Sequence, residues 1–197
     1  MVERLLMKRI PEFIIFTGPM FGSKTTRLIA ALDRFSRQGR EVVAFKPRLD
    51  NRYADGEIVT HSGGKVSATI VQSGKEIVEI VSKMPKVEVV GIDEAFMIDG
   101  VSDAALALFR KGLTVVVSSL QISATGNVFE EVRDMMPWAT KIEVCPAVCP
   151  VTGLDAFYTH RKFENMEEIS VGGSDLYEPR CWFYHPFMNT EGRDVSN

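Results

Sequence analysis

The sequence predicts an α/β fold built on a mostly parallel sheet with helices on both faces. Short apolar runs recur along residues 12–144, and the segments between them repeat apolar residues every three or four positions. Strands that alternate with helices of about a dozen residues are typical of a parallel sheet covered on both sides. After residue 144 proline and glycine become frequent and the periodicity fades, which indicates a second, smaller unit rich in loops.

The individual elements follow from these patterns. Residues 12–17 form an apolar run that ends at Gly18, which indicates a strand, and residues 25–37 have the apolar spacing of a helix. The polar segment 51–65 contains three glycines, so we expect a hairpin or a mobile loop there. The remaining strands are expected at 41–45, 87–92, 113–118 and 141–144, and the remaining helices at 73–84, 103–111 and 129–136.

The composition excludes several classes of protein. Apolar residues make up 45% and charged residues 25% of the 197 positions, as in an ordinary globular protein. No apolar run approaches the roughly 20 residues that cross a bilayer, and a net charge of -3 gives no general attraction to nucleic acid. The three cysteines, an odd number, argue for a reducing cytoplasm rather than a disulfide framework, with metal ligation as the other use of the thiols.

Residues Gly18 to Thr25 have most of the pattern of a phosphate-binding loop. They follow a strand and open a helix, and the spacing to Lys24 matches G-x-x-x-x-G-K-[ST], in which backbone amides, lysine and hydroxyl hold phosphates and Mg²⁺. Ser23 occupies the second glycine position, and glycine stands one place earlier, at Gly22. If that position needs a backbone conformation that favours glycine, Ser23 weakens nucleotide binding. The alternative is a glycine-rich turn without a ligand.

An acidic pair, Asp93 and Glu94, follows the apolar run 87–92. Phosphate-loop enzymes have an acid at the end of a neighbouring strand, where it helps to organise Mg²⁺. We predict that Asp93 is directed towards the metal and that Glu94 takes the proton from a substrate hydroxyl. The alternative is a pair of helix-capping or loop residues.

Five short segments, taken together, resemble those of a known enzyme family. The segments are Gly18-Pro-Met-Phe21, Lys46-Pro-Arg-Leu-Asp-Asn-Arg-Tyr53, Thr60-His-Ser-Gly63, Ile92-Asp-Glu-Ala95 and Val171 to Cys181. Together and in this order they resemble the thymidine kinase family of the cytosolic, zinc-ribbon type. The resemblance implies a P-loop (RecA-like) fold with a small zinc-ribbon-like lobe, ATP and Mg²⁺ as cofactors, and a homotetramer. With the change of character after residue 144, the expected parts are a leader (1–11), a nucleotide-binding domain (12–144) and a lasso or zinc-ribbon-like domain with a tail (145–197).

The resemblance also implies roles for individual residues. Glu94 is expected to deprotonate the sugar 5′-hydroxyl, with Lys24 and Arg52 as the other catalytic residues, and Thr25 and Asp93 are expected at Mg²⁺. Asp50 and Arg52 would lie near the phosphates, or else form a paired turn. His61 is expected to be a surface loop residue. The complete cofactor-binding set is Gly18, Met20, Phe21, Gly22, Ser23, Lys24, Thr25, Thr26, Asp50 and Asp93.

A thymine pocket is implied by the same resemblance, lined by apolar and aromatic side chains and read by backbone groups before Cys181. For Leu120 and Phe129 the alternative is core packing. Phe96-Met-Ile98 replaces the family's Gln-Phe-Phe, and residues 120–122 replace its Leu-Asp-Gly, so we expect a larger or differently shaped pocket. The expected substrate-binding residues are Met20, Leu120, Phe129, Ser170, Val171, Gly172, Gly173 and Tyr177.

The metal site departs most from the family pattern. A structural zinc needs four nitrogen or sulfur ligands, and two positions of the family's paired ligands are Thr152 and Tyr184 here. Two alternatives stay open. Either the lobe holds together by packing without zinc, or two shifted residues complete the site, in which case the ligands are Cys145, Cys149, Cys181 and His185.

From these features we expect a nucleoside kinase that transfers the γ-phosphate of ATP to the 5′-hydroxyl of thymidine or deoxyuridine. One alternative is a P-loop ATPase that drives a conformational switch or a motor, including one that acts on nucleic acid. Another is a descendant that binds nucleotide with weak catalysis, for which Ser23 is the main sign. We expect a cytoplasmic protein whose partners are small molecules and its own copies, without a membrane and without nucleic acid.

Overall fold

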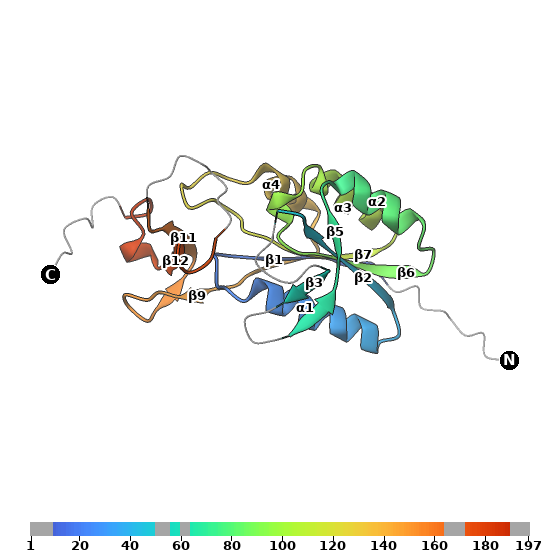
Figure 1. Cartoon of the computed structure of the whole chain (residues 1–197), viewed down its shortest axis with the longest axis horizontal. Helices are drawn as coiled ribbons and strands as arrows, with labels where there is room; N and C mark the ends of the chain where they lie inside the picture. Colours follow the sequence, from blue (N-terminus) through green and yellow to red (C-terminus); the bar gives the residue numbers. More distant parts are fainter. Residues whose placement is uncertain (1–9, 50–55, 60–63, 164–171, 190–197) are drawn as a thin grey trace.

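The computed structural model describes residues 10–49, 56–59, 64–163 and 172–189. Its centre is a parallel sheet in the order β5-β2-β6-β7-β1-β8 (Figure 1). The expected parallel α/β sheet is therefore confirmed. The strands are β1 (Phe13–Thr17), β2 (Glu41–Pro47), β5 (Thr69–Val71), β6 (Val87–Ile92), β7 (Thr114–Ser118) and β8 (Lys141–Val144).

Helices cover both faces of the sheet, as the sequence predicts. Helix α1 (Lys24–Arg37) lies on one face, and α2 (Gly74–Ser82), α3 (Val101–Arg110) and α4 (Glu130–Met135) lie on the other (Figure 1). Successive side chains of a strand point to opposite faces. Phe13 and Ile15 of β1 accordingly join the core under α3 and α4, while Ile14 and Phe16 join the core under α1. Both cores form because the central strands β1, β6 and β7 carry apolar side chains on both of their faces.

Close packing of α1 on the sheet depends on one glycine. A Cβ atom at Gly91 in β6 would lie 2.6 Å from Cδ1 of Leu32, which is shorter than any normal contact. The glycine therefore lets the helix approach the strand. This position also shows why β6 carries a glycine inside an otherwise apolar run.

The structure refines several predicted boundaries. The predicted helix 103–111 begins earlier, at Val101, because the carboxylate of Glu131 accepts hydrogen bonds from the amides of Gly100 and Ser102, both 2.8 Å long. Edge strand β5 was not predicted, since it has only three residues. The hairpin expected at 51–65 appears as β3 (Glu57–Val59) paired antiparallel with β4 (Lys65–Ser67), so it extends two residues beyond the predicted segment.

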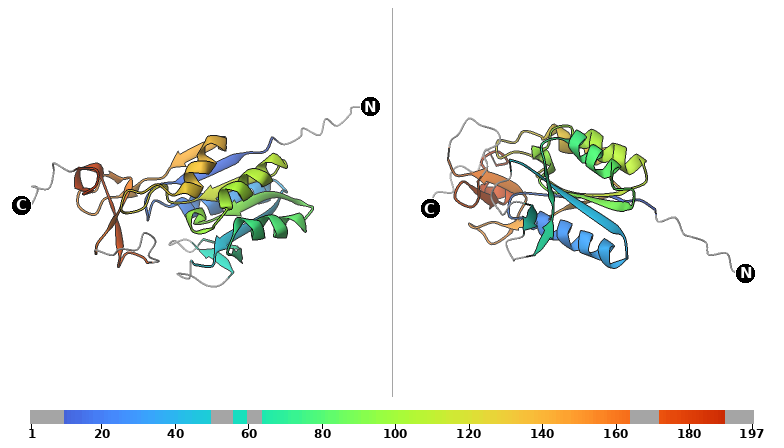
Figure 2. Two further views of the ribbon diagram at one scale, coloured as in Figure 1. Left: turned by 90° about the horizontal axis from the view of Figure 1, so that it is seen from above. Right: turned by 45° about the vertical axis from the view of Figure 1, so that its right-hand side comes forward.

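The segment after β8 forms a small lobe of short antiparallel pairs. Its elements are β9 (Ala147–Val148), β10 (Asp155–Ala156), β11 (Tyr158–Arg161), β12 (Tyr177–Arg180) and the 3₁₀ helix η3 (Trp182–Tyr184). Figure 2 shows this lobe beyond one end of the central sheet. Short 3₁₀ helices η1 (Ala95–Met97) and η2 (Met136–Trp138) follow β6 and α4. None of the described helices is long and apolar enough to span a membrane.

Candidate active site

The phosphate-binding loop connects β1 to α1, and the end of β8 fixes its shape. A Cβ atom would lie 2.3 Å from the carbonyl oxygen of Cys145 if it were placed on Gly18, and 2.4 Å if it were placed on Gly22. That carbonyl is itself held in place, because the amide of Cys145 donates to the carbonyl of Thr17 at 2.7 Å. Gly22 therefore stands where contact with β8 excludes any side chain.

Ser23 has the left-handed backbone conformation, with φ of 58°. This is the conformation that favours glycine at the corresponding place in the usual phosphate-loop pattern. Serine adopts it at a cost of about 1–2 kcal/mol. This position therefore does require the left-handed conformation that favours glycine, and the chain adopts it with a strained serine.

Replacing Ser23 with glycine is expected to stabilise the loop. The Ser23→Gly variant should gain on the order of 0.5 kcal/mol, since relief of the left-handed strain exceeds the added entropy of the unfolded chain. Chemical denaturation and ATP titration measure the gain in stability and in affinity. Ala30→Gly, at an exposed position inside α1, is the matched control and should lose about 1 kcal/mol. Equal losses in both variants would contradict the strain at Ser23.

Lys24 is buried at the start of α1, and its side chain turns back over the loop. Its Nζ donates to the carbonyl of Pro19 at 2.6 Å. A lysine ammonium at the amino end of a helix adds its charge to the helix dipole, and together they favour an anion. Lys24 is therefore held within the loop where the sequence predicts phosphate contacts.

Asp93 lies at the carboxyl end of β6 and is buried. Its carboxylate accepts hydrogen bonds from the hydroxyl of Thr25, at 3.1 Å, and from the hydroxyl of Ser118 at the end of β7. The fold thus brings together the phosphate loop and the acidic strand end, which the sequence predicted separately. Ser118 was not predicted. Its position could have indicated it, because Ser118 is the last residue of β7, the strand that follows β6 in the chain.

The pair of Thr25 and Asp93 has the donors that Mg²⁺ prefers. This ion takes oxygen ligands and usually keeps several waters, with one or two protein groups and the substrate phosphates completing its shell. One hydroxyl and one carboxylate at the phosphate loop therefore fit a magnesium ion that arrives with ATP.

Glu94 directly follows Asp93 and has a left-handed backbone conformation, with φ of 47°. This turn lies between the end of β6 and the start of η1. Strained non-glycine residues cluster at functional sites. Glu94 is half-buried, whereas its neighbour Asp93 is buried.

Aromatic side chains lie close to the acidic pair. The ring centroids of Phe96 and Phe129 are 4.6 Å apart at 39°, and Met20 packs against the core cluster that contains Leu120 and Phe129. Leu120 and Phe129 are largely buried, so core packing accounts for most of their contacts. Phe96 stands one residue before the position of the family's aromatic pair. Its ring lies against that of Phe129, which is a predicted pocket residue.

The small lobe contacts the phosphate loop directly. The amide of Met20 donates to Oγ1 of Thr159 at 3.0 Å. Tyr177 is buried beside this strand, and its hydroxyl accepts a hydrogen bond from Arg161 at 3.4 Å. Thr159 was not predicted, because a single threonine in a loop-rich tail carries no motif.

The structure describes only some of the remaining predicted site residues. Gly172 and Gly173 lie in the described part of the lobe, whereas Asp50, Arg52, His61, Ser170 and Val171 lie outside the described residues.

The four candidate zinc ligands are not gathered at one point. Cys145 lies in the core under α1, whereas Cys149 and Cys181 lie in a separate cluster within the small lobe. In the described part of the chain, no three His, Cys, Asp or Glu side chains are arranged to hold a metal ion. The donor set therefore does not fit a tetrahedral zinc site.

His185 is buried against β11, where its ring lies near those of Tyr158 and His160. Its Nε2 donates to the carbonyl of Thr159 at 3.0 Å, and its Nδ1 has no hydrogen-bond partner among the described residues. Burial lowers the pKa of the ring, and the charge of Arg180 adds to this effect, while the bond to Thr159 opposes it. The folded protein therefore holds His185 in the neutral form.

Acidification is expected to destabilise the protein through His185. The unfolded chain takes up a proton as the pH falls through the ordinary value of 6.5, while the folded chain, with its lowered pKa, does not. Stability therefore falls below that pH. The melting temperature should decrease by a few degrees between about pH 7.5 and 5.5, and the decrease should be smaller in His185→Gln. An identical pH profile in that variant would contradict the role of His185.

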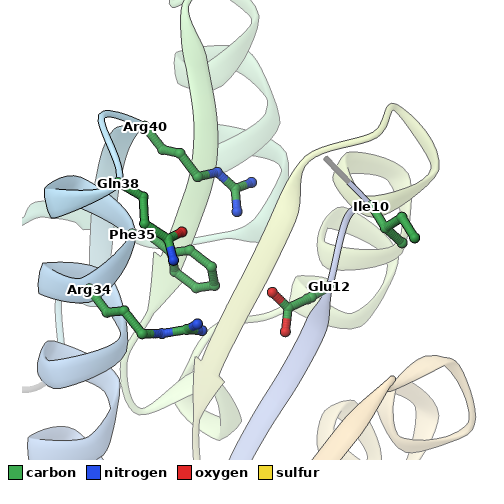
Figure 3. Close-up of a pocket in the computed structure, with 6 residues that line it drawn as sticks. All are labelled: Ile10, Glu12, Arg34, Phe35, Gln38 and Arg40. Carbon is green, nitrogen blue, oxygen red and sulfur yellow. The ribbon is translucent and has the colours of Figure 1, made fainter. Parts of the chain in front are cut away.

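A cavity of about 430 Å³ lies near the amino end of β1, between the start of that strand and the end of α1 (Figure 3). The guanidinium groups of Arg34 and Arg40 lie 4.4 Å and 4.7 Å from the centre of the Phe35 ring, so these charges pack against the end of α1. The phosphate loop follows the carboxyl end of β1, at the other end of the strand, so this cavity is not the candidate active site. Its lining residues are Ile10, Glu12, Arg34, Phe35, Gln38 and Arg40.

Comparison with known proteins assigns this arrangement to one family. The sequence profile described as "Thymidine kinase" matches residues 12–185. The chain belongs to the thymidine kinase family. This membership confirms the predicted nucleoside kinase, and ATP is the phosphate donor that such a kinase implies.

Curated relatives of the kinase carry the same name. A thymidine kinase of Thermococcus kodakarensis is 34% identical over 181 residues, which cover 87% of this chain and 92% of the relative. A thymidine kinase of Pyrobaculum aerophilum is 34% identical over 177 residues, with 85% and 95% covered. A thymidine kinase of Bacteroides thetaiotaomicron is 32% identical over 170 residues, with 85% and 83% covered. Similarity thus extends over both the central sheet and the small lobe.

Proposed function

We propose that this kinase transfers the γ-phosphate of ATP to the 5′-hydroxyl of thymidine, with deoxyuridine as a second substrate. The observation that carries the proposal is the hydrogen bond between Thr25 and Asp93, 3.1 Å long. It joins the phosphate loop to the acidic strand end, next to Glu94. Phosphoryl transfer needs substrate positioning and charge neutralisation at one place. This hydrogen bond supports the proposal because it holds the two candidate magnesium ligands together.

In this proposal the loop amides and Lys24 bind the phosphates of ATP. Thr25 and Asp93 would hold Mg²⁺, which neutralises phosphate charge when it is bound. Glu94 accepts the proton of the 5′-hydroxyl as its oxygen attacks the γ-phosphorus. Arg52 and Asp50 are proposed near the phosphates on the strength of the family pattern.

The base is proposed to lie between the phosphate loop and the small lobe. The Phe96 and Phe129 rings, with Met20 and Leu120, would supply the apolar wall, and Tyr177 would close it from β12. Backbone groups of residues 170–173 would read the polar edge of thymine. The hydrogen bond from Met20 to Thr159 supports this arrangement, since it ties the lobe to the loop.

A panel of nucleosides tests the specificity. With ATP and Mg²⁺, thymidine and deoxyuridine are expected to be phosphorylated at least about 100-fold faster, in kcat/KM, than deoxycytidine, deoxyadenosine and deoxyguanosine. Rapid turnover of a purine nucleoside would refute the proposed pocket. ATP hydrolysis that is independent of nucleoside would instead favour a motor or switch, and no turnover at all would favour a catalytically weak descendant.

We also propose that the kinase forms a homotetramer. Strand β8 is at the edge of the central sheet, and Ile142 and Val144 on it are each 45% exposed. Exposed apolar side chains on an edge strand favour association. Light scattering should give about four times the chain mass of 22.0 kDa; a monomer would refute the tetramer.

The domain division and the cellular location are proposals as well. A boundary between residues 144 and 145 is supported by the end of β8 at Val144 and by the separate antiparallel pairs that follow. The cysteines Cys145, Cys149 and Cys181 are all free thiols, which supports work in the reducing cytoplasm. A structural zinc is not part of the proposal, because the candidate ligands lie in two different clusters.

A further inference from the structure

Two cysteines meet in the small lobe where the family pattern has a metal. Cys149 lies in the turn between β9 and β10, and Cys181 follows β12. Both side chains are buried in one cluster with Ala147 and Ala156. The lobe therefore keeps one thiol from each half of the family's paired ligands, and it keeps them inside the same small core.

The contacts of Thr152 bring the two sulfur atoms to a common point. Oγ1 of Thr152 lies 3.6 Å from Sγ of Cys181, and the same side chain hydrogen-bonds the sulfur of Cys149. The sulfur of Cys149 also accepts a hydrogen bond from the backbone amide of Cys181. One hydroxyl thus touches both sulfurs, and the amide of one cysteine reaches the sulfur of the other.

We propose that Cys149 and Cys181 form a redox-active dithiol that a peroxide converts to an intramolecular disulfide. The thiolate of Cys149 attacks one peroxide oxygen, the O–O bond breaks, and Cys149 becomes a sulfenic acid while hydroxide leaves and takes up a proton to form water. The thiol of Cys181 then attacks the sulfenic sulfur, the S–O bond breaks and a second water leaves. The dithiol loses two electrons, and the peroxide gains them.

The surroundings of Cys149 favour its role as the attacking group. The amides of Cys181, Val151 and Thr152 and the hydroxyl of Thr152 donate hydrogen bonds to the sulfur of Cys149. Hydrogen bonds that a sulfur accepts favour its thiolate form. The third thiol differs, because burial in the main core raises the pKa of Cys145. Cys145 is therefore an internal control within the same chain.

The cluster that contains the two cysteines is in contact with the phosphate loop. Phe21, which has a left-handed backbone with φ of 66°, packs against the same cluster as the two cysteines. A disulfide in this cluster would join the strand pair β9 and β10 to β12. The modification site proposed here is thus separate from the kinase chemistry but in contact with the loop that holds phosphate.

Peroxide treatment followed by thiol mapping tests the proposal. The full chain is treated with hydrogen peroxide, denatured, alkylated and digested. We expect one linked peptide pair that contains Cys149 and Cys181, alkylation of Cys145 alone, and an intact mass lower by two hydrogen atoms. Three alkylated cysteines, or a pair that includes Cys145, would overturn the proposal. Purified chain with about one bound zinc per subunit would overturn it too.

Two variants separate the steps. Cys145→Ser should still form the linked pair. Cys181→Ser should stop at the sulfenic acid of Cys149, which a cyclic 1,3-diketone traps as a stable adduct. If Cys181→Ser does not fold, the mapping of the unsubstituted chain still decides, because it needs no variant. Capture of a sulfenic acid at Cys145 instead of Cys149 would contradict the assigned order.

Discussion

Glu94→Gln is expected to lower kcat about 1,000-fold while the affinity for ATP changes less than about twofold. Glutamine has nearly the same shape and fits the left-handed turn after Asp93 as well as glutamate does. It cannot accept a proton from the 5′-hydroxyl, so the loss falls on the chemical step. Single-turnover kinetics with thymidine and direct titration of ATP separate the two quantities.

A matched carboxylate controls for the general effect of charge. Asp99 is exposed a few residues further along the same connection, and Asp99→Asn should keep kcat within about twofold. If Glu94→Gln retains the kcat of the unsubstituted enzyme, Glu94 is not the base. A weaker ATP affinity with unchanged kcat would instead make Glu94 a nucleotide contact.

Gly22→Ala is expected to lose about 3 kcal/mol of folding stability. The added Cβ would lie 2.4 Å from the carbonyl oxygen of Cys145, and that backbone group is held at the end of β8. Either the loop or the strand must move, and the loop amides then no longer point to one anion. The melting temperature should fall by roughly 6–12 °C, and ATP affinity should weaken at least about tenfold.

Gly39 offers the control for Gly22. It has a left-handed backbone with φ of 74° at the end of α1, and nothing lies within 4 Å of its added Cβ. Gly39→Ala should therefore cost only the conformational strain, about 1–2 kcal/mol, with ATP affinity unchanged. Similar melting temperatures and ATP affinities in the two variants would contradict the steric account of the loop.

Much of the fold was predictable because its core elements are apolar and periodic. Strand 87–92 is buried on both faces, and its residues are apolar apart from Glu88 and Gly91. Helix α1 shows its buried stripe in the positions of Leu28, Leu32 and Phe35. Edge strand β5 and the pairs in the small lobe have two to four residues. Their formation depends on partners far away in the sequence, and no local period reveals it.

The candidate site was predictable where it depends on motifs and not where it depends on tertiary contacts. Lys24, Thr25 and Asp93 carry known patterns, and the structure joins Thr25 to Asp93. Ser118 and Thr159 enter the site only because β7 lies between β1 and β6, and because the lobe folds back on the loop. The departure at Ser23 was visible in the sequence, but its left-handed backbone was not.

Transfer of labelled phosphate tests the central claim most directly. The kinase is incubated with ATP labelled at the γ-phosphate, Mg²⁺ and thymidine, and the products are separated. The proposed function predicts label in thymidine 5′-monophosphate, dependent on thymidine and lost in Glu94→Gln. Label that appears only as inorganic phosphate, at the same rate with and without thymidine, would contradict it.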